Sequence, residues 1–515
     1  DGEMVPPDGT DVEYLAVRDD VAYADFSASF RFKFRSPIGV ARFLFRVQDS
    51  RRFYALDVPW VGQQSRGRHF WAGIVIADGT PLQRYLNFDL IPGLCARVDY
   101  WYEGRVEASG PRLRAWVDGR LVADVEDGAY ASGRVGFAGI ATPIPMTCHF
   151  ASLELSGEAV DAPAWPGLEE PPPHWITPCT ETDPKTCQSY ADLLQSGSGE
   201  LALTVAIGNP NWGEERRRVL VRSSDAGRTW SEPEAPMLQK GLGANFTRED
   251  GTWVCLFPAH PVLKCPLHAY ESDDEGRTWT GPEPLRIDGE WPERWKPGGP
   301  SRPVRLHDGS LVLPVISGLQ QSDPAAPAPY LYFCACFVLR SEDDGRTWSA
   351  PVWCDAHNLR PDEPLTPGTG PQELAGRYYE LGLAEVRDNV LLGVGRPERD
   401  PYMWQIQSND GGRTWEPAAI GPFPGYCASM TRTAGGALVA TTRFPHFAAH
   451  LSRDGGLNWD PPVIVDYARW ANQQAVEVEP DVVLVSYMGH CMDPGQADSR
   501  IARLRVTSEG LCLDH

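Results

Sequence analysis

Side chains that can exchange protons or hold anions stand at the ends of apolar runs in the C-terminal two-thirds of the chain. They are His260, Lys296, Arg302, Tyr487 and His490. An imidazole or a phenol can act as a general acid or base, and either ring can stack on a sugar. An ammonium or guanidinium group can hold a carboxylate. Each residue has an ordinary structural role as its alternative, but together they predict a polar cavity of mixed charge, as a sugar site requires.

The overall charge limits the class of partner. The chain has 47 Lys and Arg against 69 Asp and Glu, which gives a formal net charge of −22. Nucleic acids and anionic membrane surfaces bind basic surfaces, so neither is expected as a partner. A small acidic substrate remains compatible, because a local group of arginines can override the overall sign.

Motifs for cofactors, metals and membranes are missing from the sequence. It contains no His-Glu-x-x-His motif and no Gly-rich loop of the kind that holds phosphates, so neither a metal nor a cofactor is predicted. No apolar run approaches the ~20 residues of a membrane span. A secreted or periplasmic location is expected, with the leader not present in this chain.

The elements that must position these side chains are β-strands. Residues 12–156 alternate apolar and polar side chains with a period of two, for example in Phe30–Phe34 and Leu113–Val117, and Asp118-Gly119 is typical of a hairpin turn. This period predicts short strands with one buried face. We therefore place a β-sandwich at residues 1–157.

A proline-rich stretch follows at residues 158–178. Proline stiffens a chain and blocks strand pairing, so this stretch is predicted to be a linker between the sandwich and a second domain at 179–515. Within the sandwich, Trp60, Trp71 and Trp101 either line a binding face or pack in the core and rim.

An eight-residue motif recurs in the second domain. Its full form is Ser-x-Asp-x-Gly-Arg-Thr-Trp, and the copies lie at residues 223–230, 272–279, 341–348, 408–415 and, in a weaker form, 452–459. In such a turn the Asp side chain accepts backbone N–H groups, the Gly supplies a positive φ and the Trp packs between repeats. A unit repeated at this spacing predicts stacked or radial sheets, as in the four-stranded blades of a propeller.

The five copies are identified as Asp boxes, and residues 180–508 resemble the sialidase superfamily. A sixth blade without a box fits residues 471–506. The first domain, through the hairpin at 117–122 and the strand at 133–140, resembles laminin-G or concanavalin-like jelly rolls. The resemblance implies an all-β protein in which a β-sandwich (jelly-roll) domain precedes a six-bladed β-propeller. In the superfamily the boxes lie on the face away from the active site.

The resemblance also implies catalytic residues. In sialidases an arginine triad holds the substrate carboxylate, a Tyr activated by a Glu is the nucleophile, and an Asp is the general acid. Glu380 matches this Glu, because it begins the inner strand of the fourth blade, and Arg396 matches the second triad arginine. Arg443, at a strand end in the fifth blade, stands for the third. The alternatives are a solvated carboxylate and surface arginines. His446 and His450, which follow Arg443, are expected at the surface.

Two positions depart from the superfamily pattern. The strand that should carry the first triad arginine contains Gln188 and no arginine. The position of the nucleophilic Tyr is Asn472, followed by Gln473, and an amide cannot act as that nucleophile. These three residues are therefore assigned to substrate binding. Glu214 and Glu215 lie where the superfamily holds its general acid, and they are either catalytic or solvated acids beside a run of arginines.

These features favour an exo-acting glycoside hydrolase whose partner is a glycan with a terminal acidic sugar. Glu380 would be one catalytic carboxylate and Glu214 or Glu215 the other, and loss of the Tyr favours an inverting reaction in which a carboxylate activates water. One alternative is a uronate-specific polysaccharide lyase, in which His260 or Tyr487 takes the α-proton. The other is a non-catalytic carbohydrate-binding protein, because a fold does not fix a function.

Overall fold

The computed structural model describes most of the chain. The described residues are 14–18, 20–35, 38–61, 69–140, 148–162, 164, 174–179, 187–208, 217–236, 238, 241–260, 262–292, 295–319, 334–354, 378–397, 402–443, 446–467, 474–489 and 499–514. Every regular element in these ranges is a β-strand, and none of the ranges holds a helix long and apolar enough to cross a membrane. The predicted all-β fold is confirmed.

Contacts divide the chain into two compact units, which we describe separately. The first unit comprises residues 1–174, 444–450 and 460–469, and the second comprises 175–443, 451–459 and 470–515. The predicted division was contiguous in sequence. The first unit instead takes in two segments from the C-terminal part, and its strand β12 (Cys148–Val160) runs into the predicted linker.

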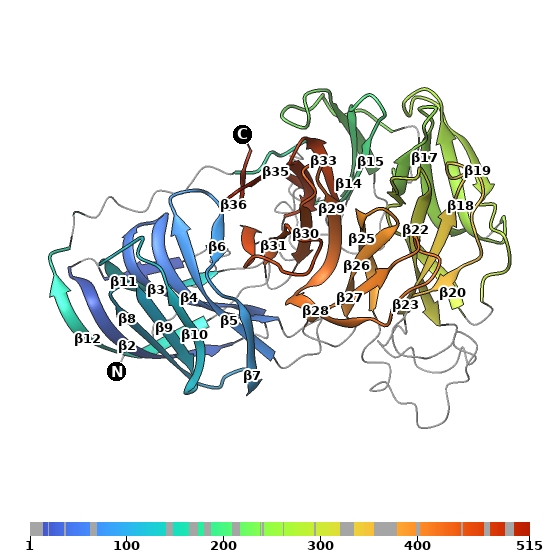
Figure 1. The fold of residues 1–515 in the computed structure, drawn as a ribbon. Coiled ribbons are helices and arrows are strands. Elements are labelled where there is room, and N and C mark those ends of the chain that lie inside the picture. The colour runs from blue at the N-terminus through green and yellow to red at the C-terminus, as the bar shows by residue number, and fades with distance from the viewer. Residues whose placement is uncertain are drawn as a thin grey trace. The chain divides into compact units, whose positions relative to one another are not determined.

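The first unit contains two antiparallel sheets (Figure 1). One has the order β10-β9-β8-β2-β12, with β2 (Ala22–Phe34), β8 (Tyr102–Ser109), β9 (Arg112–Val117) and β10 (Arg120–Glu126). Within this unit the other has the order β1-β11-β3-β4-β5-β6-β32, with β1 (Tyr14–Val17), β3 (Ile38–Asp49), β4 (Arg52–Val61), β5 (His69–Asp78), β6 (Gln83–Tyr85), β11 (Arg134–Ile140) and β32 (Val463–Asp466). A further strand, β7 (Asp89–Cys95), pairs with β5.

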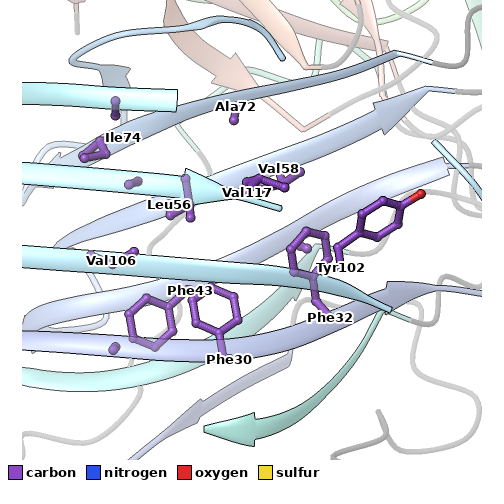
Figure 2. Packing of buried hydrophobic residues seen from close by; sticks show 14 of the residues in the cluster. Phe30, Phe32, Phe43, Leu56, Val58, Ala72, Ile74, Tyr102, Val106 and Val117 are labelled. Atoms are coloured by element: carbon purple, nitrogen blue, oxygen red, sulfur yellow. The ribbon is translucent and has the colours of Figure 1, made fainter. Parts of the chain in front are cut away.

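The two sheets bury one large apolar core between their facing sides. Side chains at every second position of β2, β8 and β9 are buried there, as the period of two predicts. Figure 2 shows Phe30 and Phe43 lying ring against ring, and their ring centroids are 4.6 Å apart. Trp60 belongs to this core and Trp71 is also buried, so neither offers an open binding face.

A group of polar side chains is buried where a C-terminal segment joins the first unit. Arg42 and Asp57 form a bidentate ion pair with N–O distances of 2.6 and 2.7 Å, and neither is more than 3% exposed. Nε2 of His446 lies 2.7 Å from the hydroxyl of Tyr85. Nη2 of Arg42 also donates to the hydroxyl of Tyr467. A buried charge needs such partners, so this network explains how the sandwich accepts the added segments.

His446 and His450 are both buried, so the prediction that they lie at the surface is wrong. The strand that follows His446, β31 (Phe447–Ser452), is buried at every position. Burial disfavours the charged imidazole and lowers the pKa of each histidine from 6.5 to about 3.

The lowered pKa of His446 predicts a pH-dependent stability. In the unfolded chain the imidazole takes up a proton near pH 6.5, whereas in the folded chain it stays neutral down to about pH 3. The free energy of unfolding therefore falls as the pH drops from about 6.5 toward 3. His446→Gln, which cannot be protonated, is expected to flatten the dependence of the thermal unfolding midpoint on pH. The exposed His307 supplies the control variant His307→Gln, and equal slopes for wild type and His446→Gln would contradict the prediction.

The second unit is built from blade-like sheets whose strands follow one another in sequence (Figure 1). The first sheet contains β13 (Cys187–Gln195), β14 (Leu201–Gly208) and β15 (Arg217–Ser223). The second contains β16 (Ala244–Thr247), β17 (Trp253–His260), β18 (Cys265–Ser272) and β19 (Thr280–Pro284). The third contains β20 (Trp295–Pro300), β21 (Val304–Arg305), β22 (Leu311–Leu319), β23 (Cys334–Ser341) and β24 (Val352–Trp353). The fourth contains β25 (Tyr378–Arg387), β26 (Val390–Pro397), β27 (Tyr402–Ser408) and β28 (Ala419–Pro424). The fifth begins with β29 (Tyr426–Arg432) and β30 (Leu438–Arg443), and the sixth contains β33 (Gln474–Glu479), β34 (Val482–Met488), β35 (Ser499–Thr507) and β36 (Gly510–Leu513). Six blades are thus present among the described residues, as predicted.

The repeated motifs form tight turns with the predicted local hydrogen bonds. In the copy at 272–279, one carboxylate oxygen of Asp274 accepts from the Ser272 hydroxyl at 2.9 Å and from the Thr278 N–H at 2.7 Å. Gly276 has a φ of +82° and its N–H donates to the Ser272 oxygen at 2.8 Å, while the Trp279 indole donates to the Gly276 carbonyl at 3.0 Å. Each of these four bonds stays within the turn, so the motif shapes the blade, and the Asp274 carboxylate is engaged in the turn.

Candidate active site

The inner strands of the blades surround a cavity of about 1040 Å³. Its lining comes mainly from β13, β16, the β20–β21 segment, β25, β29 and β33. Because a blade has four antiparallel strands, successive inner strands begin at the same mouth of the cavity. Glu380 lies near the start of β25 and Glu385 near its end, roughly 16 Å apart along the strand. The first and third strands of a blade run in the same direction, so both end at the mouth where Glu385 lies. Each repeated turn directly follows a third strand and therefore lies at this mouth, whereas Glu380 lies at the opposite one.

The acids at the Glu385 mouth are held by backbone amides. One oxygen of Glu385 accepts from the Asn389 N–H at 2.8 Å, and the other accepts from the His307 N–H at 2.7 Å. Glu477, on β33, likewise accepts from the N–H groups of Asp481 and Ala434, each at 2.8 Å. Both carboxylates hold turns in place, so we do not assign them to catalysis.

Glu380 is placed by an irregularity of its strand. Tyr379 pairs with Arg396 and Leu381 pairs with Gly395, which leaves Glu380 as an extra residue without a partner position on β26. Its φ of 52° is a conformation that side-chain-bearing residues rarely adopt. Bulges of this kind redirect a side chain and are frequent at functional sites, where the surrounding fold sustains the strain.

An arginine holds the Glu380 carboxylate. Nη1 of Arg396 donates to Oε2 of Glu380 at 2.7 Å, and the two side chains are 12% and 27% exposed. The exposed part of Glu380 belongs to the cavity, because Glu380 is one of the residues that line it. The sequence analysis placed both residues at strand ends but assigned Arg396 to the substrate carboxylate, whereas in the structure Arg396 donates to Glu380.

A tyrosine that the sequence analysis missed packs against both predicted arginines. The guanidinium carbon of Arg396 lies 3.5 Å from the centre of the Tyr426 ring, and that of Arg443 lies 5.3 Å from it. Tyr426 and Arg443 are buried and occupy paired positions on β29 and β30. A cation at this distance is attracted to the ring face, so Tyr426 helps to fix the guanidinium that holds Glu380. Its position at the start of an inner strand, like that of Glu380, was the available signal.

Tyr426 offers a test of this positioning role. If the ring is what orients Arg396, Tyr426→Phe should keep most of the activity, whereas Tyr426→Ala should lower kcat by roughly 10-fold or more through misplacement of Glu380. Steady-state kinetics of the two variants on one substrate would decide. A large loss in Tyr426→Phe would instead assign a chemical role to the phenol hydroxyl.

Arg302 also lines the cavity, between β20 and β21. Its Nη1 atom is buried and makes no hydrogen bond, and no acidic partner is recorded for it in the described part of the chain. Burial lowers the pKa of this guanidinium from 12.5 to about 10. Arg305, three residues on, shows the contrast, because it donates to Asp344 at 2.6 Å and to the Gly309 carbonyl at 3.1 Å. The Arg302 side chain is partly buried, and an unpaired cation in such a place is costly, so Arg302 is suited to receive an anionic group.

Asp192 is a further acid of the cavity that the sequence analysis did not assign. Burial raises the pKa of its carboxyl, and the guanidinium of Arg218, 3.4 Å away, opposes this rise. A Cβ atom at Gly241 would lie 2.7 Å from the Asp192 carboxylate, so only a glycine lets the loop before β16 approach this closely. These contacts join the first and second blades, and they favour a structural role for Asp192.

The remaining predicted residues are placed only in part. Tyr487 is fully buried on β34 and is not among the residues that line the cavity, so we leave it out of the proposed site. Gln188, His260 and Lys296 belong to β13, β17 and β20, but their side chains lie outside the described structure. The other candidates lie outside the described residues altogether: Glu214, Glu215, Asn472, Gln473 and His490. Among the described residues, no group of three or more His, Cys, Asp or Glu could hold a metal ion.

Comparison with known proteins identifies the repeat architecture. A family model described as a BNR repeat-like domain matches residues 180–361 and 264–469, which together span more than half of the chain. This chain belongs to the BNR repeat-like domain family. The matched region runs from the first blade to the end of the fifth, so the BNR region supplies most of the cavity lining described above.

Several solved structures are similar to this BNR protein. A protein of unknown function from Dyadobacter fermentans is 18% identical, with 65% of this chain and 100% of that chain covered and a TM-score of 0.49. A Hadza microbial sialidase is 15% identical, with 96% and 95% covered and a TM-score of 0.49. The GH93 α-L-arabinofuranosidase of Fusarium graminearum is 16% identical, with 65% and 98% covered and a TM-score of 0.44. No curated protein matched the chain.

Proposed function

We propose that this BNR protein is an exo-acting glycoside hydrolase for a glycan that ends in an acidic sugar. The observation that carries the proposal is that one cavity is lined both by a carboxylate on a strained bulge and by a partly buried guanidinium without an acidic partner in the described structure. Glu380 supplies the carboxylate and Arg302 the guanidinium. A carboxylate next to the reacting centre and a cation for the substrate's acidic group are the two parts that such a hydrolase needs.

Glu380 is suited to act as a base or a nucleophile. A neighbouring guanidinium favours the charged form of a carboxylate, and Arg396 donates to Glu380 at 2.7 Å. In the inverting reaction, Glu380 takes a proton from water while the water oxygen bonds to the anomeric carbon. The glycosidic C–O bond breaks, and an acid gives a proton to the leaving oxygen. Glu214 or Glu215 remains our proposal for that acid.

The substrate class follows from the cations at the cavity. Arg302 has no acidic partner in the described structure, and a substrate carboxylate would supply one. Sialosides and uronides both carry a carboxylate on the terminal sugar, so both belong in the test. The proteins named above include a sialidase and an arabinofuranosidase, which belong to the same broad class of enzyme.

The test is incubation of the protein with a panel of aryl glycosides and acidic oligosaccharides, including sialosides and uronides. Released sugar is measured by chromatography, and unsaturated uronate is measured by its ultraviolet absorbance. Release of a uronic acid or another acidic sugar, with the inverted anomer formed first in NMR spectra, supports the proposal. An unsaturated product would move the protein to the lyases, and no product across the panel would favour a binding protein.

A further inference from the structure

We propose that the outer face of the five-stranded sheet in the first unit is a second carbohydrate site, which takes a neutral oligosaccharide. This face contains a hollow of about 440 Å³. Six of the side chains that line it come from four neighbouring strands: Ser29, Arg31, Glu103, Arg105, Trp116 and Glu154. Neither the family match, which begins at residue 180, nor the proposed hydrolase reaction accounts for them.

Strand register places these residues in rows across the sheet. Leu121 pairs with Trp116, Trp116 with Arg105, Arg105 with Ser29 and Ser29 with Glu154. The row therefore crosses β10, β9, β8, β2 and β12, which lie consecutively in Figure 1. Neighbouring strands are about 4.8 Å apart, so the row spans roughly 19 Å. This length fits an oligosaccharide rather than a single sugar.

The hollow has an aromatic floor. Trp116 is half-buried, and the guanidinium groups of Arg105 and Arg114 lie 5.0 and 5.4 Å from its ring centre. Leu121, beside it on the edge strand, is 53% exposed. Cation contacts of this kind fix the orientation of an indole. The exposed part of the ring offers an apolar surface on which the C–H face of a sugar ring can stack.

A second indole lies on the same face. Trp101 precedes β8, and Arg31 and Lys33 lie 5.0 and 4.5 Å from its ring centre. Trp101 is four residues from Arg105, and residues at even spacing on a strand share a face. Because Trp116 pairs with Arg105, the backbone positions of the two indoles are about 13 Å apart along the strand direction. Two platforms at this separation match a ligand of several linked rings.

Acidic and basic side chains that can form hydrogen bonds are exposed on the same face. Within the described structure, the side chains of Glu103 and Glu154 have no recorded partner, and the recorded contact of Arg31 is with Trp101. Glu107, two residues further along β8, differs from these acids because it has partners: it accepts from Arg114 at 2.7 Å and also from Arg105. Sugar hydroxyls both donate and accept, so they satisfy acids and a guanidinium together. Acids and cations alternate on this face, so it has no continuous patch of one sign for a polyanion, which favours a neutral chain.

The experiment is affinity electrophoresis of the full-length Glu380→Gln protein in gels that contain xylan, arabinan, galactomannan or polygalacturonate. This variant lacks the proposed catalytic carboxylate, so the polysaccharide in the gel is not hydrolysed during the run. The result therefore reports on binding alone and does not depend on whether the hydrolase proposal is correct. We expect retardation by at least one neutral polysaccharide and a loss of roughly 10-fold or more in affinity with Trp116→Ala. Arg31→Ala and Glu103→Ala, which remove exposed side chains, should weaken binding without a change in the unfolding midpoint.

The matched control is Arg112→Ala, which lies on the same sheet and removes an exposed ion pair with Asp124. It should leave retardation unchanged. Free migration in every gel would overturn the proposal, as would retardation that survives Trp116→Ala and both exposed-residue variants. Retardation by polygalacturonate alone would overturn the assignment to a neutral ligand.

Discussion

Glu380→Gln is expected to lower kcat by roughly 10²–10⁴-fold on any substrate that the panel identifies. The amide keeps the size of the side chain but can neither take a proton nor attack the anomeric carbon. The exchange also removes the charge that Arg396 holds at 2.7 Å, so part of the loss would come from misplacement. Steady-state kinetics with the same substrate measure the change, and KM should move much less than kcat.

Glu385→Gln is the matched control for this experiment. Glu385 lies on the same strand and lines the same cavity, but its oxygens accept from backbone N–H groups. The control should therefore lower the unfolding midpoint and leave kcat of the folded protein within a few-fold of wild type. Equal kcat for wild type and Glu380→Gln would remove Glu380 from the reaction.

Arg302→Met is expected to separate binding from stability. The variant loses the cation that we assign to the acidic group of the substrate, so kcat/KM should fall by roughly 10²-fold. It also removes a guanidinium that burial destabilises, as the lowering of its pKa to about 10 reflects. The free energy of unfolding should then rise by about 1–3 kcal/mol. Thermal or denaturant unfolding of the substrate-free protein measures the second effect.

Arg305→Met provides the contrast. Arg305 also lines the cavity, but its donors bind Asp344 and the Gly309 carbonyl, so its loss leaves these acceptors unpaired. This variant should be less stable than wild type. If Arg302→Met is also destabilised and keeps full activity, Arg302 has a structural partner and the acidic-substrate assignment is wrong.

The fold could be predicted from sequence because its signals are local. The Asp and Gly of each repeated turn act within eight residues, and the bonds of Asp274 and Gly276 lie where the motif placed them. The strand period in β8 and β9 likewise depends only on neighbouring residues. Burial of His446 could not be predicted in this way, because Tyr85, its hydrogen-bond partner, lies 361 residues away in the chain.

In the candidate site, too, the features set by local sequence could be predicted and those set by distant contacts could not. The sequence by itself determined the repeat architecture and the acidic charge, and through the superfamily resemblance it predicted that Glu380 and Arg396 lie at strand ends facing the cavity. Only the tertiary structure decided that Glu380 lies on a bulge, that Tyr426 of the next blade packs on Arg396, and that Arg302 lacks an acidic partner among the described residues. The physical reason is that turns and strand periods are set by neighbouring residues, whereas the partner of a cavity side chain is set by how separate blades pack around a common axis.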